Sequence, residues 1–387
     1  MGRLLFLSNS TKPTEAEYTF IGEERLDNVT IPSVKVAGEM GMQVTVGINR
    51  KYAEQMSCVY PVSFYNAQIY RNPFNIPEVW RAYRSACTEL EKGDYTAIHC
   101  NTPIGGMVGR AVGKKYNISK VIYTAHGFHF YKGAPLFNRT VLKWAEKLMA
   151  HWTDAIVTMN TEDYAAAKKF KLRKGGKVYF VHGVGIDTKS FAPNEGVRLA
   201  KRQELGLRDD DVMLVSMGDL IPRKNYAASI RAIAKANDSR LQYMICGKGE
   251  ELENLQKLAK KLGVEKNVHF LGFRTDVKDL LAAADLFLFT TRQEGMPRSM
   301  MEAMAAGLPC VASAIRGNVD LIENEVNGYT CATEDADGYA AAIKKLADDP
   351  QLREKMRVNN LEKIKQFDSV VVEQEIREIY ADVLKKD

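Results

Sequence analysis

The chain has 387 residues, of which 45% are apolar and 26% charged, a composition typical of a soluble globular protein with two domains. No apolar run approaches the length that crosses a bilayer, and LLFL at 4–7 is too short for a signal peptide. We therefore expect a cytoplasmic protein whose contact with a membrane would be peripheral. The six cysteines form no CxxC pair, which favours reduced core residues and offers no metal-ligand spacing.

The formal charge of +6 belongs to the N-terminal half of the chain. Residues 1–190 hold 25 Lys/Arg and 16 Asp/Glu, a balance of +9, whereas the remainder holds 29 and 32, a balance of −3. Nucleic acid, anionic lipid or a phosphorylated ligand would each account for a basic surface, and so would a solvated face without a partner. The charge alone leaves these alternatives open.

Short β-branched or aromatic runs alternate with helical patterns in the first half of the chain. The runs that predict buried strands are 3–8, 42–47, 95–100, 120–126, 154–160 and 177–183. Helical patterns lie between most of them, for example at 80–93. This alternation predicts a parallel sheet covered by helices.

The same alternation restarts after a polar stretch. FAPNEGVR at 191–198 is interpreted as a linker. The strands predicted beyond it are 211–218, 241–247, 268–272, 285–291 and 309–313. The sequence therefore predicts an α/β protein with two doubly wound domains, residues 1–190 and 191–365. Ligands of such sheets bind beyond the carboxyl ends of the strands, and two facing domains leave a cleft between them.

The stretch EGMPRSMMEAMAAGLPCVAS at 294–313 predicts a helix between two strands. A helix from Arg298 to Ala306 would follow the strand at 285–291, with Pro297 in its first turn and Gly307 at its end. A helix that begins at the carboxyl end of a strand presents free N–H groups and a positive dipole end. That position suits a diphosphate.

Two carboxylates flank this helix start. Gly295 and Ser299 let a diphosphate approach closely, but Glu294 and Glu302 would repel it. Carboxylates suit a ligand that also carries vicinal hydroxyls, so we expect Glu302 to bind a ribose and Glu294 a second sugar. The alternative is that Glu302 pairs with a nearby arginine and that Glu294 is a solvated loop acid.

This stretch resembles the E-x7-E motif of the retaining nucleotide-sugar glycosyltransferases of family 4, also called group 1. Glu294 and Glu302 match the two ends of the motif, and residues 272–322 are similar to the family throughout. Further similarity lies at 124–135, 181–187, 218–225 and 246–250. The segments HGFHF and IRGN resemble bacterial exopolysaccharide and capsule members most.

The resemblance implies two Rossmann-like domains facing a central cleft, the GT-B arrangement, with the acceptor mostly on the first domain and the donor mostly on the second. It implies that the terminal helix, about 366–387, returns to the first domain. It also implies a retaining transfer from a nucleotide sugar, with UDP-sugar as the expected donor class, and with no metal, no other cofactor and no nucleic acid as partner. The D-x-D at Asp335 to Asp337 lies in an acidic run and is interpreted as surface.

The resemblance also assigns donor-binding residues. Lys224 matches the family's phosphate lysine, whose charge would stabilise the leaving diphosphate, although a solvated lysine at a helix start is the alternative. Asp219 stands where the family often has arginine, and Arg223 is expected to replace that arginine. Phe273 matches a family position that faces the nucleobase. A phenylalanine here could equally be a core residue. The other expected donor contacts are Gly247, Arg274, Gly295, Met296, Pro297, Arg298, Ser299 and Glu302.

His126 ends the predicted strand at 120–126 and matches the family histidine that approaches the donor sugar, although a histidine at a strand end is more often structural. With Lys224 and Glu294 it forms the expected catalytic set. We favour front-face attack, in which the leaving phosphate accepts the acceptor's proton, over a carboxylate nucleophile.

A second strand-end loop carries the expected acceptor contacts, which are Asn101, Thr102 and Gly105. The family often has a glycine-rich loop after the first strand. Here SNSTKPTEAEY at 8–18 lacks glycine, so no acceptor contact is assigned to it.

The stretch 136–155 has apolar residues at helical spacing: Phe137, Val141, Leu142, Trp144, Leu148 and Met149. Residues 132–177 around it hold 10 Lys/Arg and 4 Asp/Glu, a balance of +6. An interfacial helix on anionic lipid has this pattern, and so does a core helix with a basic outer face. The subgroup resemblance favours a polyprenyl-diphosphate-linked saccharide as acceptor, which would bring the enzyme to the inner membrane surface.

The expected function is therefore a retaining hexosyl- or N-acetylhexosaminyl-transferase of surface polysaccharide synthesis. A sugar-nucleotide epimerase or hydrolase on the same fold is one alternative, for which only His126 and Glu294 offer acid–base groups. A non-catalytic nucleotide-sugar-binding subunit is another, because Asp219 departs from the family pattern.

Overall fold

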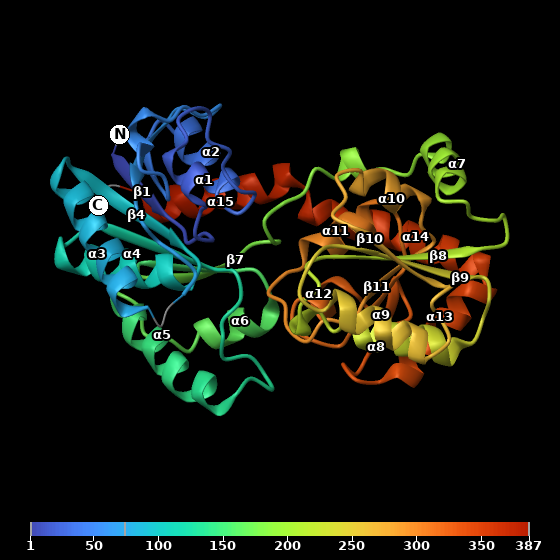
Figure 1. Ribbon diagram of the computed structural model, residues 1–387. Helices are drawn as coiled ribbons and strands as arrows, with labels where there is room; N and C mark the ends of the chain where they lie inside the picture. Colours follow the sequence, from blue (N-terminus) through green and yellow to red (C-terminus); the bar gives the residue numbers. More distant parts are fainter. Residues whose placement is uncertain (1, 73–74, 386–387) are drawn as a thin grey trace. The chain divides into compact units, whose positions relative to one another are not determined.

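The structure is a computed structural model that describes residues 2–72 and 75–385. The chain forms two compact units, shown in Figure 1. The N-terminal unit comprises Met1–Gly185 with Val370–Asp387, and the C-terminal unit comprises Ile186–Ser369. The chain thus changes unit at 185–186 and again at 369–370, where the sequence suggested 190–191 and about 366.

The N-terminal unit is built on a seven-stranded, entirely parallel sheet of order β3-β2-β1-β4-β5-β6-β7. The strands are β1 (Arg3–Leu7), β2 (Gln43–Ile48), β3 (Val62–Asn66), β4 (Tyr95–Asn101), β5 (Lys120–Ala125), β6 (Ala155–Thr158) and β7 (Lys177–Phe180). The sequence missed β3. The order reverses between β1 and β4, which is the switch point where doubly wound sheets bind ligands.

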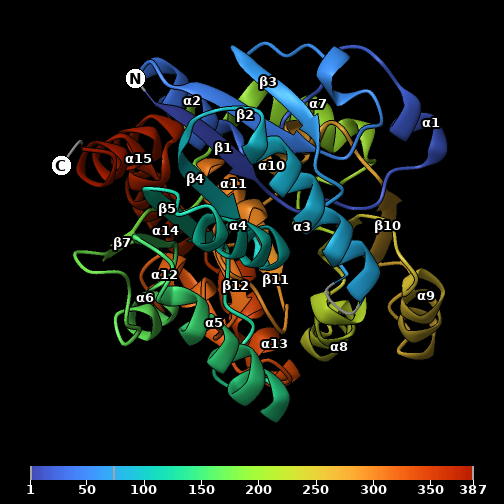
Figure 2. The same ribbon diagram turned by 90° about the vertical axis from the view of Figure 1, so that its left-hand side faces the viewer.

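Helices cover both faces of this sheet. They are α1 (Glu15–Thr19), α2 (Ile31–Glu39), α3 (Ile76–Glu91), α4 (Pro103–Lys115), α5 (Lys143–Ala150), α6 (Thr161–Ala167) and α15 (Ser369–Val383). Figures 1 and 2 show α3, α4 and α5 on one face and α2 beside α15 on the other. An ion pair of 2.7 Å between Lys35 and Glu373 joins α2 to α15. The end of the chain is therefore part of the N-terminal unit.

The C-terminal unit repeats this topology with a six-stranded parallel sheet of order β10-β9-β8-β11-β12-β13. Its strands are β8 (Val212–Met217), β9 (Leu241–Cys246), β10 (Val268–Gly272), β11 (Leu286–Phe289), β12 (Cys310–Ser313) and β13 (Gly328–Cys331). The sequence missed β13. The switch point lies between β8 and β11, so the loops after these two strands are the expected ligand site.

The helices of the C-terminal unit are α7 (Glu195–Glu204), α8 (Tyr226–Ala236), α9 (Leu252–Lys261), α10 (Val277–Ala283), α11 (Arg298–Ala305), α12 (Asn318–Leu321), α13 (Ala336–Asp348) and α14 (Pro350–Lys363). Figure 1 shows α8, α9 and α13 on one face of the sheet and α10, α11 and α14 on the other. The core packs Leu214, Tyr243 and Leu288 from the sheet against the apolar sides of α8 and α13.

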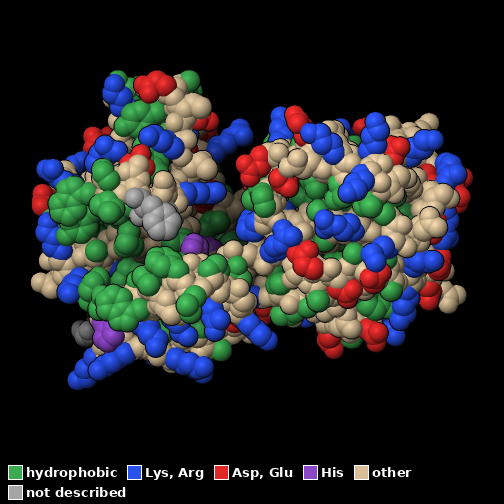
Figure 3. Space-filling model, turned by 60° about the horizontal axis from the view of Figure 1, so that its bottom comes forward, with side chains coloured by type: hydrophobic (Ala, Val, Ile, Leu, Met, Phe, Trp, Pro, Cys, Tyr) green, Lys and Arg blue, Asp and Glu red, His purple; other side chains and the backbone are tan. Residues whose placement is uncertain are grey.

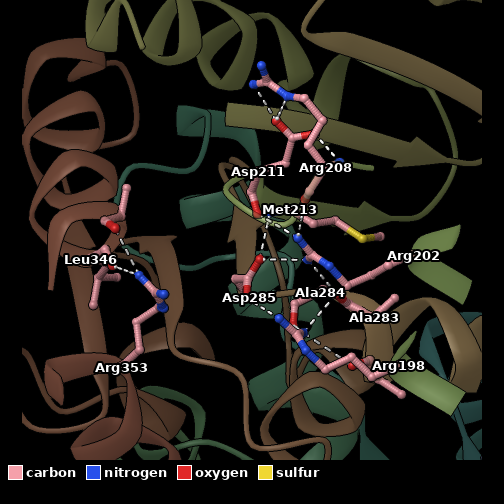
Figure 4. A network of polar contacts seen from close by, with 12 residues as sticks. Arg198, Arg202, Arg208, Asp211, Met213, Ala283, Ala284, Asp285, Leu346 and Arg353 are labelled. Carbon is pink, nitrogen blue, oxygen red and sulfur yellow. Dashed lines mark hydrogen bonds and ion pairs between the residues drawn. The ribbon is translucent and has the colours of Figure 1, made fainter. Parts of the chain in front are cut away.

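The interpretation of residues 191–198 as a linker is wrong, because α7 begins inside that stretch. The Asn194 side chain accepts a hydrogen bond from the N–H of Val197 and caps the helix. Arg198 and Arg202 then bind the two oxygens of Asp285 at 2.6 and 3.1 Å, just before β11 (Figure 4). The polar residues that suggested a linker are therefore anchors of a surface helix.

Candidate active site

The loop after β8 passes close to the end of β9. Gly218 has a φ of +145°, and a Cβ there would lie 3.3 Å from Cε of Lys224. Gly247 has a φ of +158°, and its Cβ would lie 1.9 Å from the carbonyl oxygen of Gly218. Glycine at 247 is thus explained by this backbone approach. Its contact with a donor stays a prediction.

The turn Pro222–Lys224 is fastened to the end of β11. The N–H of Arg292 donates to the carbonyl oxygen of Arg223 at 2.8 Å. Thr290 Oγ1 donates to the carbonyl oxygen of Asn225, also at 2.8 Å. The two loops at the switch point therefore support each other, and the side chains of Arg223 and Lys224 start from a fixed backbone.

Glu294 lies where these two loops meet. Its Oε1 atom accepts from Lys224 Nζ at 2.8 Å, from Arg223 Nη1 at 2.9 Å and from Thr291 Oγ1 at 3.0 Å. The side chains of Lys224 and Glu294 are each only 13% exposed. Two cations against one carboxylate leave an excess positive charge in a half-buried position, which favours binding of an anion.

Glu302 lies on α11 and is paired with an arginine. Arg298 Nε donates to Glu302 Oε1 at 2.7 Å. The structure thus contains the arginine pair that the sequence left as the alternative for Glu302. The other alternative, a solvated acid at Glu294, is wrong because that carboxylate is held by three side chains.

The start of α11 differs slightly from the expectation. Pro297 is the N-cap residue rather than part of the first turn. Its side chain has no acceptor, so it makes no cap hydrogen bond to the first N–H groups of the helix. The following Ser299 and the preceding Gly295 and Met296 are partly exposed. Gly307 follows the helix with a φ of +79°, as a terminating glycine does. The first N–H groups of α11 therefore follow Glu294 by a few residues in the loop that also contacts Lys224.

Phe273 and Arg274 follow β10 and have different surroundings. Phe273 is 69% exposed, which excludes the core position that the sequence left open. Arg274 donates to Asp276 at 2.6 Å and to Glu204 at 3.4 Å, so its guanidinium joins α7 to the loop before α10. Contacts of these two residues with a nucleobase stay predictions.

Both carboxylates of the D-x-D at Asp335 to Asp337 have structural partners. Asp335 accepts from the N–H of Gly338 at 2.9 Å and caps α13. Asp337 pairs with Lys235 of α8 at 2.5 Å. These acids fasten α13 to its neighbours, which is the surface role expected of them.

His126 follows β5 in the N-terminal unit. Its Nε2 atom is buried and has no hydrogen-bond partner among the described residues. It lines a cavity of about 20 Å3 together with Asn101, His99 and Thr124. Burial lowers the pKa of His126 to about 4, so the imidazole is neutral at neutral pH and can accept or donate one hydrogen bond at each nitrogen.

Asn101, Thr102 and Gly105 join the loop after β4 to the loop after β1. Asn101 is buried and donates to the carbonyl oxygen of Val29 at 3.3 Å. Thr102, with a φ of +66°, accepts from the N–H of Asn9 at 3.0 Å. A Cβ at Gly105 would lie 3.2 Å from the carbonyl oxygen of Leu7. These residues shape the switch point of the N-terminal unit, and their contact with an acceptor stays a prediction.

A polar pocket of about 230 Å3 shares Asn9 with this hydrogen-bond network. It lies beyond the carboxyl ends of β1 and β2, and its lining includes Ser8, Asn9, Arg25, Asp27, Asn49 and Arg50. Hydroxyl, amide, carboxylate and guanidinium groups together are the set that binds sugar hydroxyls. The sequence assigned no contact here because the loop lacks glycine, so this pocket is a candidate saccharide site that the sequence did not indicate.

Comparison with known proteins decides the family. The family model described as "Glycosyl transferases group 1" matches residues 197–363, and "Glycosyltransferase Family 4" matches residues 36–189. EpsD of Bacillus subtilis (strain 168), named as a glycosyltransferase, is 32% identical over 92% of this chain and 93% of its own length. This chain belongs to the group 1 glycosyltransferases.

Other relatives of this glycosyltransferase have more specific names. The UDP-Gal:alpha-D-GlcNAc-diphosphoundecaprenol alpha-1,3-galactosyltransferase of Escherichia coli is 28% identical over 76% of this chain and 77% of its own length. HepE of Anabaena, solved in complex with UDP-glucose, has a TM-score of 0.76 at 21% identity over 98% of this chain and 100% of its own. WaaG, from lipopolysaccharide biosynthesis, has a TM-score of 0.70 at 17% identity over 97% and 99%. The α/β, two-domain GT-B fold is thereby confirmed.

Three residues that lie against Glu294 or Gly295 in the candidate site were not predicted from the sequence. Thr291 donates to Glu294, and Arg316, which is buried, donates from Nε to the carbonyl oxygen of Glu294 at 3.0 Å. Gly317 has a φ of +80°, and its Cβ would lie 2.3 Å from the carbonyl oxygen of Gly295. The available signal was IRGN, which contains Arg316 and Gly317 but was used only as a mark of resemblance.

Proposed function

We propose that this glycosyltransferase moves a sugar from a UDP-sugar to a polyprenyl-diphosphate-linked saccharide in surface polysaccharide synthesis, with retention of anomeric configuration. The observation that carries the proposal is the meeting of Arg223 and Lys224 at Glu294, beside the start of α11. Similar proteins support the substrate classes, since the Escherichia coli relative is named for UDP-Gal and a diphosphoundecaprenol-linked sugar, and the structurally similar HepE was solved with UDP-glucose.

In this proposal the cations stabilise the leaving group. Transfer breaks the bond between the anomeric carbon and the diphosphate oxygen, so negative charge grows on the diphosphate. Lys224, Arg223 and the first N–H groups of α11 can neutralise that charge without a metal ion. The acceptor hydroxyl attacks from the face on which the diphosphate leaves. Its oxygen bonds to the anomeric carbon, its proton passes to the departing phosphate oxygen, and UDP is released.

The carboxylates bind hydroxyls of the donor. Before donor binding, Glu294 is occupied by Lys224 and Arg223, and Glu302 is occupied by Arg298. A diphosphate competes for the same cations, which frees Glu294 for the sugar hydroxyls, and a ribose replaces or joins Arg298 at Glu302. Neutral His126 contributes a hydrogen bond to the donor sugar. Glu294 acts by positioning and not as a nucleophile.

The acceptor is assigned to the N-terminal unit. The polar pocket beyond β1 and β2 has groups that suit a saccharide, and Asn101 and Thr102 shape its neighbouring loop. None of the described helices is long and apolar enough to cross a bilayer. We therefore propose a peripheral enzyme at the cytoplasmic face of the inner membrane, where a polyprenyl-linked acceptor presents its saccharide.

The deciding experiment is a thermal-shift panel with UDP, GDP, ADP and their common sugar conjugates, each with and without EDTA. Ligands of the folded state raise the melting midpoint by mass action. A shift with uridine nucleotides alone that EDTA leaves unchanged supports the metal-independent UDP-sugar enzyme. No shift with any nucleotide or sugar conjugate would indicate a degenerate donor site at Asp219 and contradict the proposed function.

The donor selected in this way is then assayed with a soluble diphosphate-linked saccharide. The anomeric configuration of the first product is read by NMR. An α product from an α donor supports retention. Free sugar or an epimerised donor, formed at the same rate without acceptor, would favour the hydrolase or epimerase alternative.

A further inference from the structure

The segment before and within α5 carries its apolar side chains on the outside of the N-terminal unit. Leu136, Phe137, Val141, Trp144 and Leu148 are between 41% and 73% exposed. They extend through the π-helical turn Asn138–Leu142 into α5. The sequence left open a core helix with a basic outer face, and these exposures exclude it. Contiguous large apolar side chains on a surface mark a contact with a partner or a membrane.

The inward side of α5 carries a buried charge beside the buried Ala150. Glu146 accepts from Arg110 Nη1 of α4 at 2.7 Å and from Tyr123 Oη of β5 at 3.4 Å. Arg110 is fully buried, and its guanidinium carbon lies 3.9 Å from the centre of the Tyr123 ring. A helix of a water-soluble domain normally turns its apolar side inward and its charges outward. Here an ion pair anchors the helix, and its tryptophan faces out.

The same segment presents positive charge outward. Arg139, Lys143 and Lys147 are exposed. The acids in the stretch 136–155 are used internally, since Glu146 binds Arg110 and Asp154 binds Arg173 at 2.9 Å. Figure 3 shows hydrophobic side chains gathered on the N-terminal unit with Lys and Arg side chains at their border. A mixed apolar and cationic surface complements an anionic bilayer and repels a second copy of itself.

We propose that residues 136–148, the exposed helix surface, insert into an anionic lipid bilayer. Trp144, Phe137 and Leu148 enter the boundary between headgroups and acyl chains, while Lys143 and Lys147 extend to the anionic headgroups. The Arg110–Glu146 pair keeps the helix on its unit while its outer side is withdrawn from water. This inference rests on the proposed function, in which the enzyme is peripheral to a membrane, and it names the surface that makes the contact. Vesicle binding requires no donor, so the two proposals can fail separately.

The first test is co-sedimentation of the full chain with vesicles. Vesicles of phosphatidylcholine alone are compared with vesicles that contain one third phosphatidylglycerol. The wild type is expected to bind the anionic vesicles, and Trp144→Ser with Leu148→Ser is expected to weaken that binding about tenfold or more through lost apolar burial. The matched control is Leu199→Ser, since Leu199 is 61% exposed on α7 of the C-terminal unit. Equal binding of all variants, or no binding of the wild type, overturns the proposal.

The second test reports on insertion itself. The chain has three tryptophans, so Trp80→Phe with Trp152→Phe leaves Trp144 as the only one. Anionic vesicles are expected to shift its emission to the blue, and brominated lipids are expected to quench it. In 0.5 M salt, where the screening length is about 4 Å, binding weakens but the shift persists. Vesicle binding without any shift assigns the contact to another surface and overturns the proposal.

Two further readouts are needed. One asks whether the exposed helix surface binds a bilayer or a second copy of the chain, and the other asks whether vesicle binding and sugar transfer are lost independently. Lipid-free self-association that Trp144→Ser abolishes would make a second copy the occupant and overturn the bilayer assignment. Transfer to a soluble acceptor is expected to remain within about twofold of wild type in Trp144→Ser, because this residue lies outside the proposed donor site. Loss of soluble transfer in the wild type, with vesicle binding intact, refutes the proposed function alone.

Discussion

The ammonium of Lys224 lies 2.8 Å from Oε1 of Glu294, and the guanidinium of Arg223 reaches the same oxygen at 2.9 Å. One carboxylate oxygen therefore holds both cations of the proposed diphosphate site and keeps two like charges together in a half-buried loop. In the proposed function, donor binding is an exchange of these ionic partners, and that exchange can be tested.

Replacing Lys224 with alanine should mainly reduce turnover. Loss of one preorganised positive donor at a developing anion typically costs a factor of about 10²–10³ in kcat. Steady-state kinetics with saturating UDP-sugar measure this effect. Lys235→Ala is the matched control, because Lys235 lies on α8 of the same unit and pairs with Asp337 of α13. Unchanged turnover in Lys224→Ala would refute the phosphate role.

Replacing Glu294 with glutamine should have opposite effects on the binding of UDP and on the turnover of the UDP-sugar. The amide no longer competes as an anion for Lys224 and Arg223, so UDP alone is expected to bind several-fold to about tenfold more tightly. Turnover of the UDP-sugar should fall, because the carboxylate that positions the sugar is gone. Titration calorimetry with UDP and kinetics with UDP-sugar test the two halves. Weaker UDP binding in Glu294→Gln would contradict the partner exchange.

Replacing Glu302 with alanine should weaken binding of the nucleoside portion of the donor. A charged hydrogen bond to a hydroxyl contributes about 1.5–3 kcal/mol, which corresponds to a loss of roughly tenfold or more in affinity for UDP. Calorimetry with UDP measures the loss, and kcat at saturating donor should change little. Glu354→Ala, which removes the partner of Arg357 on α14, is the control. If both variants bind UDP like the wild type, Glu302 does not contact the ribose.

Most of the sheet could be predicted from the sequence because its central strands are buried on both faces. The two missed strands, β3 and β13, are both at sheet edges. An edge strand is covered less completely than a central one, and Val62–Asn66 is only partly buried. Its sequence, VSFYN, has a short apolar run that is broken by serine, so it gives a weak strand signal. Gly328–Cys331 begins with a glycine whose Cβ would lie 2.3 Å from the carbonyl oxygen of Cys310. Such a glycine removes the usual strand signal while allowing the close pairing.

The residue types of the candidate site could be predicted from the sequence, but the contacts among them could not. Lys224 and Glu294 are 70 positions apart, so their contact depends on how the loops after β8 and β11 meet. The polar pocket beyond β1 and β2 likewise combines Ser8 and Asn49 from different loops. The sequence left open whether the apolar side of α5 faces the core or the surface, because helical spacing identifies that side but does not give its direction. Its orientation depends on Arg110, a residue of another helix.

Removing one partner of the Arg110–Glu146 pair should destabilise the N-terminal unit. Arg110→Met leaves the Glu146 carboxylate next to α4 without its charge partner, which typically costs about 3–5 kcal/mol. Arg110→Met with Glu146→Leu should recover most of that loss, since an apolar pair of similar volume replaces the ions. Urea unfolding followed by circular dichroism measures each variant. A double variant as unstable as the single one would show that the hydrogen bonds, rather than the buried charge, dominate.

Acid should destabilise the N-terminal unit through its buried histidines. Burial lowers the pKa of His99 to about 3 and that of His126 to about 4, whereas an unfolded histidine titrates near 6.5. Between those values the unfolded chain binds protons that the folded chain does not. The stability present above pH 6.5 is therefore lost as the pH falls, by up to about 1.4 kcal/mol per pH unit for each histidine.

His126 is the better residue for testing this dependence. His99 binds Tyr380 at 2.6 Å and Thr124 at 2.7 Å, so its replacement would also break two hydrogen bonds. His126→Gln removes a titrating ring whose Nε2 has no hydrogen-bond partner among the described residues. Urea unfolding at pH 7, 6, 5 and 4.5 should show a shallower decline for His126→Gln than for the wild type. The exposed His151 provides the control, because His151→Gln should leave the decline unchanged. Parallel declines in all three proteins would mean that His126 becomes protonated without unfolding the unit.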